Sequence, residues 1–245
     1  RQRQMCIRDR DIRGWLQIVR GIEKAPEGMT MSEYAFRRST TANPFPSQMG
    51  RVCPAPCQSG CNRNEVDDYV GINAVEQFIG DNAIKENYKF EEAPKLLKHK
   101  VAIIGGGPAG LSAAFQLRKM GYGSTIFEER EELGGMMRYG IPNYRTPRDI
   151  LDKEIQRILD LGDIEVITQK RVGKDIPLDE VEKSHDAVLW TIGCWTGKGL
   201  PVEGGDAENC LSGVAFLEAF CQGRLKVGAK RVVCVGGGDT SIDVV

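Results

Sequence analysis

The 245-residue sequence predicts an α/β fold, because two short apolar runs are each followed by a glycine-rich turn and the start of a helical pattern. The first run is Val101–Ile104 and the second is Val232–Val235. Continuous apolar runs of this length are typical of strands buried in a parallel sheet. The order strand, turn, helix is typical of doubly wound α/β units. The segment before the first run has a different, helical character.

Composition excludes several classes of protein. The formal net charge is −1 and no long basic stretch occurs, so nucleic acid and acidic membrane surfaces are not expected partners. No apolar run approaches the roughly 18 residues of a membrane-spanning helix. The eight cysteines include no C-x-x-C pair, which makes disulfides the less favoured use. We expect a cytoplasmic enzyme.

The first glycine-rich turn has the pattern of a dinucleotide pyrophosphate cradle. Gly105 permits the tight turn, Gly107 lets the backbone approach a phosphate, and Gly110 lets the helix pack on the strand. The N-terminus of the helix predicted over 109–120 would attract the anion. A glycine-rich surface loop is the alternative. The expected cofactor contacts here are Gly105, Gly107, Pro108, Ala109 and Gly110.

An acidic residue follows the next predicted strand, Ser124–Phe127. Glu128 stands 23 positions after Gly105, about where a carboxylate accepts hydrogen bonds from ribose hydroxyls. Together with the turn, it predicts a complete dinucleotide site.

The second turn reads G-x-G-x-x-S, with the small Ser241 in the third glycine position. It begins only ten residues from the end of the sequence, so we expect a truncated domain and leave NADH and NADPH both open. The expected nucleotide contacts are Gly236, Gly238, Asp239, Thr240 and Ser241.

Three cysteines stand four apart in the helical segment, where helices are predicted over 12–20, 31–39 and 70–89. Cys53, Cys57 and Cys61 are punctuated by prolines and glycines, which could direct their thiolates toward one centre. Thiolates without a nearby histidine favour iron–sulfur over zinc. A structural zinc site is the alternative.

The first ten residues are expected not to belong to the natural protein. Back-translation of Met5–Arg10 resembles an adapter used for sequencing libraries, so Cys6 is not taken as a ligand. A basic targeting peptide is the alternative. We expect both ends of the sequence to be truncations.

Several strings together carry a family resemblance: R-V-C-P-A-P-C-x-x-x-C, V-G-I-N-A-V-E-Q-F, V-A-I-I-G-G-G-P-A-G-L, L-G-G-M-M-R-Y-G-I-P-N-Y-R and V-V-C-V-G-G-G-D-T. The chain resembles the small (beta) subunit of glutamate synthase, the amino-terminal half of dihydropyrimidine dehydrogenase, and related NAD(P)H–ferredoxin oxidoreductases. The string beginning C-N-R-N-E-V-D-D-Y is most similar to the glutamate-synthase-like oxidoreductase that partners dissimilatory sulfite reductase.

The resemblance implies a helical iron–sulfur domain over 11–95 with two [4Fe-4S] clusters. Cys53, Cys57 and Glu76 would serve one cluster and Cys61 the other, with further cysteines upstream. An ordinary solvated helix carboxylate is the alternative for Glu76.

The resemblance also implies a Rossmann-like FAD-binding domain over 96–225 and the start of an NAD(P)-binding domain over 226–245. Arg145 would contact flavin, with a surface salt bridge as its alternative. A buried strand over 187–193 would end in T-x-G beside the cofactor. The residues implied as FAD contacts are Gly134, Gly135, Arg145, Thr191 and Gly193.

The function implied is electron transfer from NAD(P)H through FAD and [4Fe-4S] clusters to a partner, either a large catalytic subunit or ferredoxin. No acid–base residue is required, and His99 and His185 receive no catalytic role. One alternative is an electron-transfer subunit without nicotinamide activity. Another, a flavin disulfide reductase, predicts a C-x-x-C that the sequence lacks.

Overall fold

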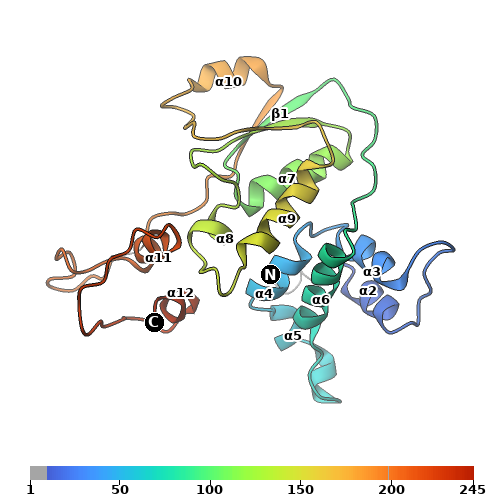
Figure 1. Ribbon diagram of the computed structural model, residues 1–245, viewed down its shortest axis with the longest axis horizontal. Helices are drawn as coiled ribbons and strands as arrows, with labels where there is room; N and C mark the ends of the chain where they lie inside the picture. Colours follow the sequence, from blue (N-terminus) through green and yellow to red (C-terminus); the bar gives the residue numbers. More distant parts are fainter. Residues whose placement is uncertain (1–9, 198) are drawn as a thin grey trace. The chain divides into compact units, whose positions relative to one another are not determined.

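The computed structural model describes residues 10–197 and 199–245, coloured along the chain in Figure 1. The predicted adapter-derived segment, apart from Arg10, lies outside the described residues. The described chain divides into two compact units. The first comprises the chain up to Lys98 together with Ser112–Gly123 and Asp149–Ile164, and the second comprises His99–Leu111, Ser124–Arg148 and Glu165–Val245.

The first unit is helical, and its predicted helices are confirmed. Asp11 caps the first helix by accepting from the Gly14 N–H, and Thr30 caps the second by accepting from the Glu33 N–H. The apolar faces of these helices bury Trp15 and Phe36 in a common core. The helices before the sheet are α2 (Ile12–Val19), α3 (Met31–Ser39), α4 (Pro46–Val52), α5 (Pro56–Ser59), the 3₁₀ helix η1 (Asn62–Glu65) and α6 (Ile72–Lys85).

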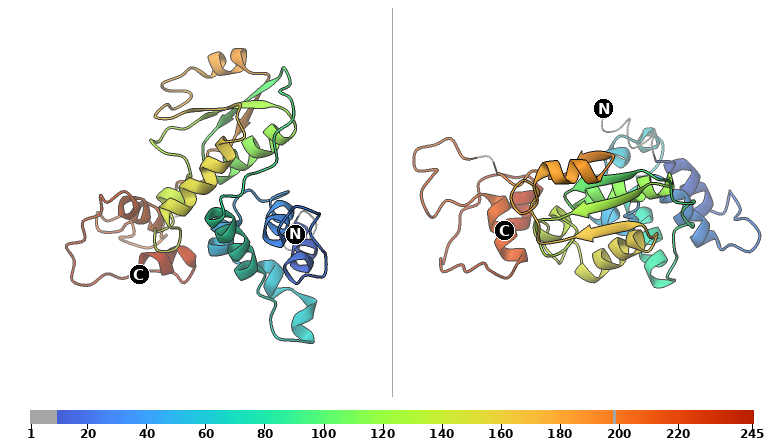
Figure 2. Two further views of the ribbon diagram at one scale, coloured as in Figure 1. Left: turned by 45° about the vertical axis from the view of Figure 1, so that its right-hand side comes forward. Right: turned by 90° about the horizontal axis from the view of Figure 1, so that it is seen from above.

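The second unit carries a four-stranded sheet in the order β3-β2-β1-β4, seen from above in Figure 2. β1 runs parallel to β4, with Val101 opposite Ala187. The strands are β1 (Lys100–Ile104), β2 (Gly123–Phe127), β3 (Ile164–Ile167) and β4 (Ala187–Trp190). The remaining helices of the described chain, of which α9 and most of α7 belong to the first unit, are α7 (Pro108–Lys119), α8 (Met136–Tyr139), α9 (Arg148–Leu159), α10 (Leu178–Ser184), α11 (Gly213–Cys221) and α12 (Asp239–Val244).

Two strand predictions need correction. The strand predicted over 187–193 ends at Trp190 and is not buried: Trp190 is 52% exposed, because β4 lies at an edge of the described sheet. The predicted strand Val232–Val235 does not form in the described chain, and Val233 is 86% exposed. An apolar run becomes a strand only where a neighbour supplies its hydrogen bonds, and no described strand lies beside this run.

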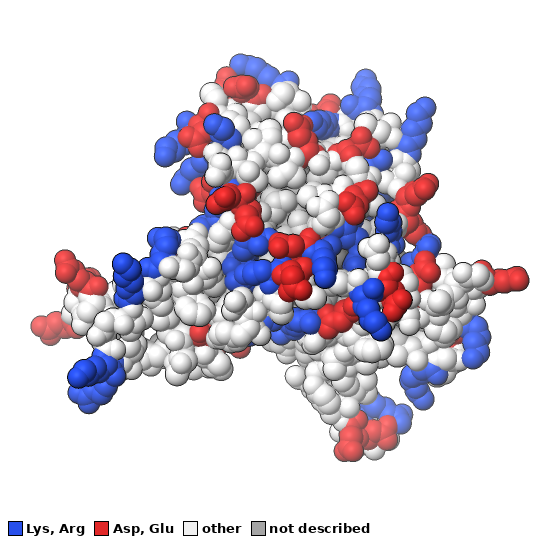
Figure 3. Space-filling model, in the orientation of Figure 1, with Lys and Arg blue, Asp and Glu red and all other residues white. Residues whose placement is uncertain are grey.

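Charges of both signs are interspersed on the face shown in Figure 3. Among the described residues, no helix combines the length and the apolar character needed to cross a bilayer.

Candidate cofactor sites

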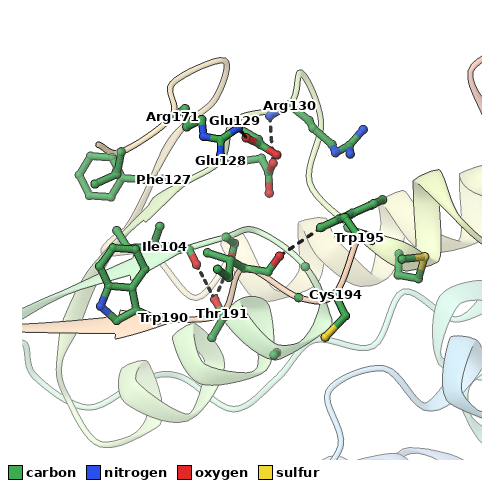
Figure 4. A pocket seen from close by; sticks show the side chains of 18 of the residues that line it. Ile104, Phe127, Glu128, Glu129, Arg130, Arg171, Trp190, Thr191, Cys194 and Trp195 are labelled. Carbon is green, nitrogen blue, oxygen red and sulfur yellow. Dashed lines mark hydrogen bonds and ion pairs between the residues drawn. The ribbon is translucent and has the colours of Figure 1, made fainter. Parts of the chain in front are cut away.

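A cavity of about 660 Å³ opens where β1, β2 and β4 end, within the second unit (Figure 4). This is the edge at which parallel α/β sheets bind ligands, and the volume is of the size that holds cofactors. The predicted cofactor residues that line it are Gly105, Gly107, Pro108, Ala109, Glu128, Gly135, Thr191 and Gly193.

The first turn is built from positions that exclude side chains. Gly105 has φ +111°, and a methyl group there would lie 2.5 Å from the carbonyl oxygen of Thr191. A methyl group at Gly110 would overlap the carbonyl oxygen of Gly105. At Gly135, with φ +49°, it would lie 2.7 Å from the Cα of Gly107. Backbone therefore approaches backbone throughout this wall of the cavity.

Gly107 is different, because the protein itself leaves room for a side chain. A methyl group at Gly107 would make only an ordinary contact, 3.6 Å from the Cα of Gly135. The space beside Gly107 is cavity, which fits the close approach of a pyrophosphate to the backbone.

Glu128 lies at the end of β2 and is held in place by backbone donors. One carboxylate oxygen accepts from the Gly106 N–H at 2.7 Å, and the other accepts from the Arg130 N–H at 2.9 Å. The side chain is buried but lines the cavity (Figure 4). Each carboxylate oxygen keeps a further lone pair, which could accept a hydrogen bond from a ribose hydroxyl.

Arg130 is a cavity residue that the sequence reasoning missed. Its guanidinium lies 4.0 Å from the centroid of the Trp195 ring and 4.8 Å from that of Tyr139, and it pairs with Glu218 at 2.6 Å. Cation–π contacts and an ion pair together hold this wall of the cavity. Because the three partners are spread over the sequence, no local motif marks Arg130 in advance.

Arg145 does not line this cavity. Its Nη1 donates to both carboxylate oxygens of Asp243 at 2.8 Å, and the Asp243 side chain is buried rather than at the surface. Gly110 and Gly134 also lie outside the cavity lining. Gly110 lets the helix pack closely on the strand, and the Gly134 N–H donates to the Gly106 carbonyl.

The second glycine-rich turn leads into helix α12, but the residues before it, 232–235, do not form a strand. Gly238 precedes α12, which begins at Asp239. Gly236 has φ +130° and Ser241 lies close to it. From Gly236 to Thr240 the chain is exposed, so this turn is an open feature in the described chain.

The three cysteines of the helical unit lie on backbone of different conformation. Cys53 follows α4 in an extended conformation, Cys57 is buried in α5, and Cys61 is extended again after it. Among residues 10–197 and 199–245, no three histidine, cysteine or acidic side chains gather as a metal site. The described residues alone thus do not make up a complete ligand set, and the ligand roles of the three cysteines stay a prediction.

Glu76 is not a solvated carboxylate, as its alternative required; it is 2% exposed. Its oxygens accept from Arg10 Nη1 at 2.9 and 3.0 Å and from Asn43 Nδ2 at 2.7 Å. Burial raises the pKa of Glu76, and the Arg10 charge and the Asn43 hydrogen bond oppose that rise. In this chain Arg10 supplies a cationic partner for the buried carboxyl group.

Comparison with known proteins divides the sequence in the same order. Residues 3–88 match dihydropyrimidine dehydrogenase domain II, 4Fe-4S cluster. The NADPH-Fe(3+) oxidoreductase subunit beta of Geobacter sulfurreducens strain PCA is 42% identical over 225 residues, covering 88% of this chain and 33% of that protein. The glutamate synthase [NADPH] small chain of Bacillus subtilis is 34% identical over 222 residues, covering 86% of this chain and 45% of that one. The chain thus spans less than half the length of these relatives.

A solved structure of 2-naphthoyl-CoA reductase shares the fold, with a TM-score of 0.50 and 22% identity over 71% of this chain and 24% of that one. The resemblance to the glutamate synthase small chain is confirmed by these similarities, and so is the α/β class with an iron–sulfur segment first. Residues 99–244 match the pyridine nucleotide-disulphide oxidoreductase model, which covers more than half of the chain. The chain belongs to the pyridine nucleotide-disulphide oxidoreductase family.

Proposed function

We propose that the whole protein passes electrons from NAD(P)H through FAD and [4Fe-4S] clusters to a partner protein, as an enzyme of the cytoplasm. The partner would be a large catalytic subunit like that of glutamate synthase, or ferredoxin. The observation that carries the proposal is the glycine-walled cavity ending at Glu128, directly after a segment that matches a 4Fe-4S domain.

The residues present fit FAD, which would supply hydride acceptance and single-electron release when bound. Gly105 and Gly107 would let the backbone lie against the pyrophosphate, and the first N–H groups of α7 would face its charge. Glu128 would accept from the ribose hydroxyls. Thr191 steadies the turn, because its hydroxyl donates to the carbonyls of Ile104 and Gly105 at 3.0 and 2.9 Å.

The remaining assignments rest on the resemblance. Gly236, Gly238, Asp239, Thr240 and Ser241 would begin the nicotinamide nucleotide site, and Gly134, Gly135, Arg145 and Gly193 would complete the flavin site. Cys53, Cys57, Cys61 and Glu76 would ligate clusters with residues outside the described chain. A partner of dissimilatory sulfite reductase is the alternative within this class, and an electron-transfer subunit without nicotinamide activity is the second.

The test uses a full-length clone purified without oxygen. The protein is expected to contain flavin and to oxidise NADPH or NADH with an artificial acceptor, and absence of flavin would refute the proposal. Gly238→Val in the same clone is expected to remove turnover while leaving the flavin content unchanged. If turnover survives Gly238→Val, hydride does not enter at this turn, and the alternative of an electron-transfer subunit whose nicotinamide site is inactive is favoured.

Replacing Glu128 with glutamine is expected to weaken FAD binding roughly tenfold, the effect of losing about one charge-assisted hydrogen bond. The amide keeps one acceptor but presents an NH₂ to a backbone donor. Quenching of FAD fluorescence on titration measures the affinity. Glu129→Gln is the matched control, since Glu129 is the next residue, also lines the cavity and pairs with Arg171 at 3.4 Å. Equal affinities of the two variants would contradict the ribose role.

A further inference from the structure

A buried carboxyl group joins two segments that are far apart in the sequence. Glu154 of α9 is fully buried, with 0% of its surface exposed. One of its oxygens accepts from the Ser47 N–H at 2.8 Å and the other accepts from the Gln48 N–H at 3.0 Å. Glu154 belongs to the stretch that matches the pyridine nucleotide family, whereas Ser47 and Gln48 belong to the stretch that matches the 4Fe-4S domain. All three lie in the first unit.

The contact supplies what α4 lacks. The first N–H groups of a helix have no partner within the helix, and a side chain just before it usually accepts from them. The residue in that position is Phe45, which makes no capping hydrogen bond. The side-chain amide of Gln48 is itself buried and has no partner among the described residues. Glu154 therefore caps α4 from more than a hundred residues away.

α4 packs closely, backbone to backbone, against α6. A methyl group at Gly80 would overlap the backbone nitrogen of Ser47, and one at Gly50 would lie 2.6 Å from the backbone nitrogen of Gln77. Neither contact leaves room for a shift in one helix alone.

Side chains tie the same two helices together. Arg51 of α4 donates to both carboxylate oxygens of Asp81 at 2.8 and 2.9 Å. The Ser47 hydroxyl also donates to Asp81. The N-terminal turn held by Glu154 is therefore part of one rigid network.

The other end of α4 is the cysteine segment. Cys53 follows the helix directly, and its carbonyl accepts from Asn73 Nδ2 at 2.7 Å. Cys53 stands six positions after Ser47, about 9 Å along the helix axis at 1.5 Å per residue. A tilt at Ser47 thus changes where the Cys53 thiol lies.

We propose that Glu154 is a positioning residue: through the first turn of α4 it sets the position and the solvent access of the Cys53 thiol. The nucleotide-binding part of the sequence thereby takes part in shaping the cysteine segment. The inference bears on the proposed function because Cys53 is a predicted cluster ligand, but the contacts that carry it involve only this chain.

The test measures thiol reactivity in the full chain, kept reduced and metal-free. Alkylation of each cysteine by iodoacetamide is followed by peptide mass spectrometry, with the exposed Cys210 as the internal standard. Glu154→Ala is expected to raise the rate at Cys53 roughly tenfold relative to Cys210, as for loss of about 1.4 kcal/mol of buried hydrogen bonding. Glu154→Gln keeps one acceptor, so it is expected to raise that rate less and to preserve the fold if the alanine variant does not.

Ile158→Ala is the matched control, because Ile158 is buried on the same helix and its truncation weakens the core without removing the cap. An equal rise at Cys53 in Ile158→Ala would show general loosening and overturn the inference. An unchanged ratio of Cys53 to Cys210 in both Glu154 variants would overturn it as well. Iron uptake by the wild-type chain is measured in a separate experiment. Failure to take up iron would count against the proposed cluster ligands but would not affect the comparison of thiol reactivities.

Discussion

Gly110→Ala is expected to lower the affinity for FAD by on the order of 100-fold, because forcing a methyl group into closely packed backbone costs about 1–3 kcal/mol and displaces the cradle as well. The added methyl group would overlap the carbonyl oxygen of Gly105 and would lie 2.9 Å from the Thr191 hydroxyl and 3.1 Å from Ile103. Gly105 belongs to the turn and the Thr191 hydroxyl bonds its carbonyl, so the strain falls on the phosphate cradle. Titration with FAD, followed by flavin fluorescence, measures the loss.

The control for this substitution is Gly228→Ala. Gly228 has nothing within 4 Å of an added methyl group and lies outside the cavity lining. It should bind FAD like the wild type. Retention of wild-type affinity by Gly110→Ala would mean that helix and strand can separate without harm, which would contradict the role given to this glycine. Circular dichroism of both variants separates loss of the cradle from loss of the fold.

Stability is expected to fall as the pH rises from about 5 to 8, and Glu154 is expected to cause a large part of that fall. Burial raises the pKa of Glu154 to about 8, against the hydrogen bonds from the Ser47 and Gln48 N–H groups and the charges of Arg157 and Arg51. The unfolded chain releases this proton near pH 4.3, so between the two values the folded state holds one more proton. The contribution is complete below the lower value and is lost as the pH approaches the upper one.

The expected slope from this single group is about 1.4 kcal/mol per pH unit within that window. Urea unfolding at several pH values measures it, and Glu154→Gln should remove the slope because an amide does not titrate. Asp81 titrates elsewhere: burial acts to raise its pKa, but hydrogen bonds from Arg51 and Ser47 outweigh burial and hold that pKa below its ordinary value. Parallel pH profiles for the wild type and Glu154→Gln would contradict the assignment.

Local chemistry explains which features could be predicted. The turn at Gly105, the helix after it and the acid at Glu128 follow from backbone freedom, apolar patterning and spacing, all of which act over a few residues. The capped helices of the first unit follow in the same way from residues such as Thr30. Such signals survive in any short window of the sequence.

Other predictions failed where the outcome depends on neighbours distant in the sequence. The apolar run Val232–Val235 has the pattern of a strand but no described strand beside it. The run over 187–190 does form a strand, but its place at an edge of the described sheet leaves Trp190 exposed.

The sequence by itself determined the α/β class, the dinucleotide cradle and the order of an iron–sulfur segment before a nucleotide-binding one. Only the tertiary structure decided that Glu76 is buried against Arg10, that Arg130 stacks on Trp195 in the cavity wall, and that Glu154 caps α4. The physical reason is that burial and hydrogen-bond partners are properties of surfaces brought together by folding. The sequence does not distinguish a carboxylate or guanidinium whose hydrogen bonds go to water from one whose hydrogen bonds go to protein groups.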